Sequence, residues 1–138
     1  MLSEKIRQGI IDRALEARAN AYAPYSGFKV GAAVLAGSGA VYGGCNVENA
    51  SFGGTLCAEQ VACAAAVAAG ERLITAVAVA TQSDEPAPPC GICRQFLSEF
   101  GPEIEIVLVN TTGKLVQTTL AALLPRQFKL TVRANARP

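Results

Sequence analysis

Apolar residues near the start of the chain recur every three or four positions, which is the spacing of one face of a helix. Ser3 precedes this stretch and suits the capping position, so we expect an amphipathic helix that ends near Asn20. A second helical stretch, residues 56–69, is rich in alanine and is closed by Gly70. Two further helices are predicted at 91–100 and 120–124.

Five shorter stretches have the composition of β-strands. Residues 28–36 and 40–47 are joined by Gly37-Ser38-Gly39, which predicts a hairpin. Residues 73–80 are almost all apolar, as expected for a strand that is buried on both faces. Two more strands are predicted at 104–110 and 114–118. Because helices alternate with strands after residue 55, we predict an α/β fold with a mixed sheet that is partly parallel.

Composition limits the size and state of this fold. The chain has 138 residues, of which 51% are hydrophobic, so we expect an ordered chain with one core and a single domain spanning 1–138. Neither a signal-peptide pattern nor an apolar run of transmembrane length is evident, which makes the cytoplasm the expected location and predicts no membrane partner.

The charge argues against a nucleic-acid partner. The net charge is only +1, whereas binding to a phosphate backbone favours a strongly basic face. Four basic residues do gather near the C-terminus, and we interpret them as solvated: Arg126, Lys129, Arg133 and Arg137.

Three cysteines and a glutamate carry the strongest chemical signal. Cys57-Ala58-Glu59 is followed, after a long gap, by Pro89-Cys90-Gly91-Ile92-Cys93. This spacing predicts one Zn²⁺ per chain, bound by Cys57, Cys90 and Cys93. The chain has no histidine, so three protein ligands leave the fourth position open, as a hydrolytic zinc site requires.

Two other cysteines bear on that prediction. Cys63 lies six residues after Cys57, which on one helix places it roughly 240° away and turns it from the same metal. Cys45 lies in the predicted strand at 40–47 and is the plausible fourth thiolate, so a closed structural site stays an alternative.

Both groups of ligands fall where a predicted helix begins. Helix N-termini lower the pKa of a thiol and so favour metal binding. Residues two apart on a regular helix point in nearly opposite directions. Cys57 and Glu59 can therefore approach one metal only if Cys57 is the capping residue. In that position Glu59 is expected to be the catalytic residue, moving a proton from water to a leaving nitrogen.

Three thiolates also create an electrostatic problem. They give the zinc site a formal charge of −1, which weakens its ability to activate water. A nearby cation would offset this charge. Arg94, directly after Cys93, is the predicted residue for the charge balance, and a solvated helix residue is the alternative.

Four segments in order resemble the cytidine deaminase family, in its small three-cysteine form. The zinc motifs above match its signature. Residues 24–33 resemble its first loop and strand, residues 44–51 its ribose-binding segment, and Leu124-Pro125 with Phe128 its C-terminal motif. The resemblance runs from about Tyr22 to Phe128. It implies a three-layer α/β/α sandwich with about five strands, and hydrolysis of cytidine and 2′-deoxycytidine to the uridines, with release of ammonia, in pyrimidine salvage.

The same resemblance assigns substrate contacts. Asn46 and Glu48 would bind the ribose hydroxyls, and an amide beside a carboxylate suits a vicinal diol. Phe28 would stack on the base, and Ala58 would offer backbone groups to the pyrimidine. Phe128 would reach the active site of a neighbouring subunit in a homotetramer.

The alanine-rich stretch gives separate support to such an assembly. A helix that is apolar on nearly every side must be buried on all sides, and closely packed subunits would achieve this. Burial between the sheet and neighbouring helices of one chain is the alternative.

Two positions depart from the family pattern. Residue 60 is Gln where many three-cysteine members carry an arginine, which leaves Arg94 with more of the charge compensation. Residue 52 is Phe where a tyrosine is common, which removes a hydroxyl group at the expected subunit boundary.

Three other functions are considered. One keeps the chemistry and changes the substrate: a blasticidin S deaminase-like enzyme that acts on a cytosine nucleoside antibiotic. The second is a thiol–disulfide protein that uses Cys90 and Cys93, which leaves Cys57 and Glu59 without a role. The third is a non-catalytic zinc module that binds nucleic acid, which the charge disfavours.

Overall fold

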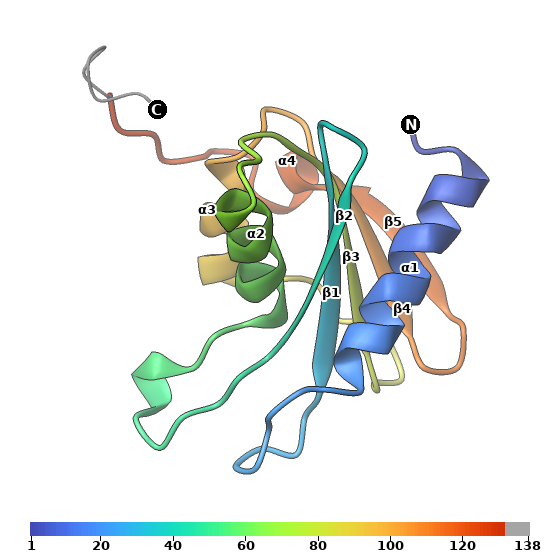
Figure 1. The fold of residues 1–138 in the computed structure, drawn as a ribbon, viewed down its shortest axis with the longest axis vertical. Helices are drawn as coiled ribbons and strands as arrows, with labels where there is room; N and C mark the ends of the chain where they lie inside the picture. Colours follow the sequence, from blue (N-terminus) through green and yellow to red (C-terminus); the bar gives the residue numbers. More distant parts are fainter. Residues whose placement is uncertain (132–138) are drawn as a thin grey trace.

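The computed structural model describes residues 1–131 and shows a five-stranded mixed sheet (Figure 1). The strands lie in the order β2-β1-β3-β4-β5, and only the pair β3 and β4 is parallel. Their bounds are β1 (Val30–Ala36), β2 (Val41–Cys45), β3 (Ile74–Thr81), β4 (Glu105–Asn110) and β5 (Leu115–Thr119). The predicted hairpin and the partly parallel sheet are confirmed. Arg133 and Arg137 lie outside the described residues.

Helices cover both faces of the sheet, which confirms the three-layer sandwich (Figure 1). Helix α1 (Glu4–Arg18) covers one face, where Ile10, Ile11 and Ala14 share a core with β1, β3 and β4. The opposite face carries α2 (Ala58–Ala68), α3 (Gly91–Ser98) and α4 (Leu120–Leu123). None of the helices among residues 1–131 is long and apolar enough to cross a membrane.

The starts of the helices agree with the sequence. The hydroxyl group of Ser3 accepts a hydrogen bond from the Ile6 N–H, 3.2 Å away, and so caps α1. Cys57 is the capping residue of α2, with extended dihedral angles of φ −75° and ψ 152°. Cys90 caps α3 in the same way, with φ −67° and ψ 172°. The prediction that Cys57 precedes the helical turns is therefore confirmed.

Strand β1 begins two residues later than predicted, because a side chain holds the backbone before it. The amide of Asn46 donates to the Phe28 carbonyl at 2.8 Å and accepts from the Val30 N–H at 2.9 Å. The Phe28 N–H donates to the Ser26 hydroxyl at 3.0 Å. These bonds occupy the backbone groups that a longer strand would pair across the sheet.

Helix α2 is buried on one side only. Ala58, Ala62 and Ala66 are buried against the sheet, whereas Ala64 and Ala65 are exposed, as are residues 68–70 at the end of the helix and in the turn after it. The alternative that one chain buries this helix on all sides is wrong, because neither neighbouring helix covers its outer face.

Candidate active site and zinc centre

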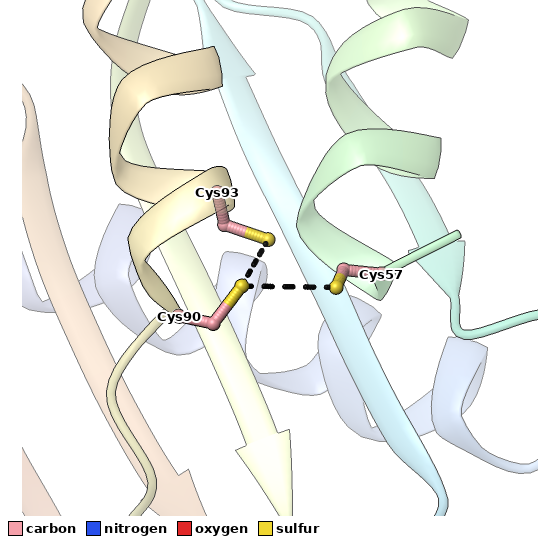
Figure 2. Close-up of side chains that lie close together, drawn as sticks. All are labelled: Cys57, Cys90 and Cys93. Atoms are coloured by element: carbon pink, nitrogen blue, oxygen red, sulfur yellow. Dashed lines mark hydrogen bonds between the residues drawn. The ribbon is translucent and has the colours of Figure 1, made fainter. Parts of the chain in front are cut away.

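Cys57, Cys90 and Cys93 meet between two helices of the same layer (Figure 2). Cys57 comes from the start of α2, and the other two come from the first turn of α3. The Cys90 sulfur lies 3.9 Å from that of Cys57 and 3.5 Å from that of Cys93. Thiolates around a tetrahedral zinc, with Zn–S bonds of about 2.3 Å, lie about 3.8 Å apart. The donor set and its spacing therefore fit Zn²⁺.

The environment of the thiols favours the thiolate form at Cys57, whereas the bond with Cys57 and burial raise the pKa of Cys93. The neighbouring Cys93 thiol lowers the pKa of Cys57 to about 7, against the opposing effects of burial and of Glu59. Cys57 and Cys90 also stand at helix N-termini, where the backbone N–H groups favour negative charge.

The other two cysteines do not join this group. Within residues 1–131, the three sulfurs of Cys57, Cys90 and Cys93 form the one cluster with metal-ligand spacing, all within 4.8 Å of one another. Cys63 is fully buried in the core, where burial raises the pKa of its thiol to about 11. Cys45 is a half-buried free thiol. The alternative of a closed site with a fourth cysteine is not supported, because the cluster offers three thiols.

A cavity of about 210 Å³ opens beside the thiols. It lies between the first turn of α2, the ends of β1 and β3, and the loop that leads into α3. Its lining is mostly apolar with a few polar groups, as is usual for a small-molecule site. The lining residues are Phe28, Val30, Asn46, Thr55, Cys57, Ala58, Glu59, Val79, Thr81, Ala87, Pro88 and Cys90.

Glu59 is a buried carboxylic acid in this cavity. Its side chain is only 4% exposed, and burial raises its pKa above the usual value. A carboxyl group with a raised pKa holds a proton more readily, which suits a group that must take up and release one proton in each cycle. The structure places Glu59 in one cavity with Cys57 and Cys90, and its catalytic role stays a prediction.

The structure separates the two predicted ribose contacts. Asn46 is 8% exposed and lines the cavity, but its amide is already bonded to the backbone at Phe28 and Val30. Glu48 lies in an adjoining hollow, where its carboxylate accepts hydrogen bonds from the Tyr25 and Ser26 N–H groups and from the Ser26 hydroxyl. The serine bonds hold the pKa of Glu48 below its usual value. Their contacts with ribose stay predictions.

Of the three other predicted substrate contacts, two line the cavity and one does not. Phe28 and Ala58 line the cavity. Phe128 does not: its side chain is 65% exposed and its carbonyl accepts a hydrogen bond from Gln95 on α3. A role of Phe128 in the site of another subunit stays a prediction.

Arg94 bonds to backbone rather than to sulfur. Its Nε donates to the Pro89 carbonyl at 2.8 Å, and its Nη1 donates to the Leu123 carbonyl at 2.9 Å. These bonds hold the guanidinium between the residue before Cys90 and the end of α4. The role of Arg94 in charge balance stays a prediction that rests on this proximity.

The two residues that depart from the family pattern, Gln60 and Phe52, both contact other residues of the chain. Gln60 accepts a hydrogen bond from the Cys57 N–H at 3.3 Å and so stabilises the start of α2. Phe52 is exposed and lies edge-on to the Tyr25 ring, with 5.7 Å between ring centres.

Sequence reasoning missed several residues of the cavity wall. Thr81 ends β3, and its hydroxyl pairs with that of Ser83 at 2.8 Å. Its place at the carboxyl end of a buried strand is a signal that could have been used. Ala87 and Pro88 directly precede the second zinc motif. Thr55 carries no signal in the sequence.

Three clustered thiols that fit zinc, with a buried carboxyl group in the adjoining cavity, are the arrangement of the zinc-dependent deaminases, a class of hydrolase. Comparison with known proteins agrees. Residues 4–110 match the family model "Cytidine and deoxycytidylate deaminase zinc-binding region". The chain belongs to the cytidine deaminase family.

Individual relatives resemble the chain over most of its length. A cytidine deaminase of Halalkalibacterium halodurans is 45% identical over 123 residues, which cover 88% of this chain and 93% of the relative. A crystal structure of cytidine deaminase from Burkholderia pseudomallei superposes with a TM-score of 0.85 at 45% identity, covering 92% of this chain and all of that one. A blasticidin-S deaminase of Bacillus cereus is 36% identical over 107 residues, which cover 72% of this chain and 76% of the relative.

Proposed function

We propose that this enzyme hydrolyses cytidine and 2′-deoxycytidine to uridine and 2′-deoxyuridine and releases ammonia. The observation that carries the proposal is the meeting of Glu59 and the zinc ligands Cys57 and Cys90 in the lining of one small cavity. The relatives named cytidine deaminase support the choice of substrate.

Cys57, Cys90 and Cys93 would hold the metal. When bound there, Zn²⁺ supplies Lewis acidity that lowers the pKa of a water molecule at its open position. The buried setting of Glu59 places a carboxylate where it can take a proton from that water. The water oxygen would bond to C4 of the cytosine ring as N3 takes up a proton, and the bond from C4 to the amino nitrogen would then break. Glu59 would carry one proton of the water to N3 and the other to the leaving nitrogen, so that C4 keeps the oxygen as a carbonyl group and ammonia departs.

The cavity wall fits a flat pyrimidine. Phe28, Val79 and Pro88 provide apolar surface, and Ala58 places backbone groups of the first helical turn beside it. Asn46 and the adjoining Glu48 would meet the sugar, with Thr55 lining both hollows. The mostly apolar wall leaves a few polar groups to orient the substrate.

A nucleoside panel with metal analysis tests the proposal. Release of ammonia from cytidine and 2′-deoxycytidine by protein that contains one zinc per chain is the expected result. Turnover confined to blasticidin S would instead identify an antibiotic deaminase. Zinc without any turnover would leave a binding module, and disulfide exchange without zinc would identify a redox protein.

Asn46→Ala and Glu48→Ala should each reduce kcat/KM for cytidine. We expect losses on the order of 1–3 kcal/mol in transition-state binding, because a hydroxyl group of the sugar is left without its partner. Steady-state kinetics on cytidine checks this, with circular dichroism to confirm that the turn held by Glu48 is intact. Unchanged kcat/KM in both variants would point away from recognition of ribose.

We also propose a homotetramer with active sites completed across subunits. Three features of the single chain support it: the uncovered outer face of α2 with Ala64 and Ala65, the exposed ring of Phe52 beside the cavity, and the exposed ring of Phe128. Such apolar surface favours association. Light scattering after size exclusion is expected to give four times the chain mass. A fully active monomer at low concentration would contradict both the tetramer and the shared site.

A cytoplasmic location and a role in pyrimidine salvage belong to the same proposal. All five cysteines are free, including Cys45, which takes no part in the metal site. Free thiols are the state that a reducing compartment maintains.

A further inference from the structure

Helix α2 lies directly on strand β2 at Gly44. A Cβ atom at this position would lie 2.7 Å from the Ala58 carbonyl oxygen, 2.3 Å from the Ala62 nitrogen and 2.9 Å from the Ala62 Cα. All three are backbone atoms, so they can move only if the helix moves. The absence of a side chain at Gly44 therefore sets the distance between this strand and the helix.

The helix segment at this contact belongs to the active site. Ala58 lies between the metal ligand Cys57 and the proton carrier Glu59, and it is fully buried. Any shift of the first turn of α2 therefore moves the ligand and the acid together. Cys90 and Cys93 would not follow, because they belong to α3, which begins after β3 and its loop.

The neighbouring glycine faces the other side of the sheet. A Cβ at Gly43 would lie 2.5 Å from the Cζ and 2.7 Å from the Nη1 of Arg13, which belongs to α1. These atoms are the end of a long, half-exposed side chain, which can move aside. Substitution of glycine by alanine at these two adjacent positions therefore has different consequences. At Gly43 the new methyl group meets a mobile side chain, whereas at Gly44 it meets the backbone of α2.

A third glycine meets a backbone far from the metal. A Cβ at Gly31 in β1 would lie 2.0 Å from the Ala14 carbonyl oxygen and 2.6 Å from the Arg18 nitrogen, both in α1. This contact is as tight as the one at Gly44, but it holds the helix on the opposite face of the sheet.

We infer that Gly44 is a positioning residue for the zinc centre. Its bare Cα lets the first turn of α2 rest on β2, and this contact keeps Cys57 and Glu59 aligned with Cys90 and Cys93. The inference rests on the zinc-dependent deaminase function, but the metal centre can be observed without any substrate.

Three matched variants test the role of Gly44: Gly44→Ala, with Gly43→Ala and Gly31→Ala as controls. Each is loaded with Co²⁺, whose charge-transfer and d–d absorption bands report the thiolate geometry. Release of zinc to a chromophoric chelator is then timed. In Gly44→Ala we expect shifted cobalt bands, and zinc affinity weaker by about ten- to a hundredfold, as for other residues that orient metal ligands. We expect kcat to fall with KM less affected, because the acid is displaced.

The controls separate positioning from general loss of stability. Gly43→Ala is expected to match the parent in all three measurements. Gly31→Ala is expected to lower the thermal midpoint while it keeps the parental cobalt bands and zinc release. Parental bands and zinc release in Gly44→Ala would overturn the inference, whatever its activity. Equal disturbance of the metal in Gly31→Ala would overturn it as well.

A second variant covers the case in which Gly44→Ala does not fold. Ala62→Gly adds no atom at the contact, but it gives conformational freedom to the helix residue whose N and Cα meet Gly44, and so loosens the backbone of α2 there. Altered cobalt bands and faster release of zinc are expected. Parental behaviour of Ala62→Gly would overturn the inference. If the parent protein does not turn over cytidine but shows the cobalt spectrum of a thiolate site, the proposed substrate is wrong. The positioning role of Gly44 is not affected by that outcome.

Discussion

Glu59→Gln should retain zinc and bind nucleoside but lose nearly all turnover. The amide has the size of the carboxyl group, so the 4% exposed site keeps its shape, but the amide cannot take a proton from water or give one to the leaving nitrogen. General acid–base groups contribute about 10²- to 10⁴-fold, and here one residue would serve both transfers. The measurements are kcat by ammonia release, zinc content, and nucleoside affinity by calorimetry.

Glu103→Gln is a matched control for Glu59→Gln. This glutamate is exposed and lies outside the cavity, so the same chemical change there should leave kcat unchanged. Activity of Glu59→Gln within about tenfold of the parent would show that another base performs the proton transfer.

Cys57→Ala, Cys90→Ala and Cys93→Ala should each reduce the zinc content from one per chain to nearly none. Loss of one of three thiolates removes a large share of the binding free energy, and the remaining pair holds zinc poorly. Stability should fall as well, because the metal links α2 to α3. Elemental analysis and thermal unfolding of the purified variants provide the measurements.

Cys45→Ala and Cys63→Ala provide the controls for those ligand variants. Both should keep their metal, since neither sulfur joins the cluster. Cys63→Ala removes a fully buried sulfur atom from the core and should cost only about 1 kcal/mol in the free energy of unfolding. Full retention of zinc by Cys57→Ala would disprove the assigned ligand set.

The elements and the metal site could be predicted because each depends on local spacing. The recurrence of apolar residues every three or four positions located α1, and the alternation of helices and strands predicted a partly parallel sheet, in which the parallel pair is β3 and β4. The position of Cys57 followed from geometry alone, since a capping residue is the one place from which it and Glu59 can approach the same metal.

The cavity wall could not be predicted, because it depends on contacts between distant segments. Asn46 lines the cavity and at the same time bonds to residues 28 and 30, which no spacing rule reveals. Glu48 closes a turn through Tyr25 and Ser26 and lines the adjoining hollow rather than the cavity that Asn46 lines. The exposed side of α2 could not be predicted either, because the composition of a helix gives its polarity but not which elements pack against it.

The order of the strands has a consequence for how the protein is made. Each strand after the first pairs with one that has already been synthesised, so the sheet can grow as the chain emerges. The metal ligands do not follow this order: Cys57 emerges before β3, whereas Cys90 and Cys93 emerge after it. During that interval Cys57 lacks the Cys93 thiol that lowers its pKa in the folded protein, so it gains its thiolate character only when α3 arrives. Zinc uptake is thus a late step in biosynthesis, and it marks the moment at which the two halves of the chain have come together.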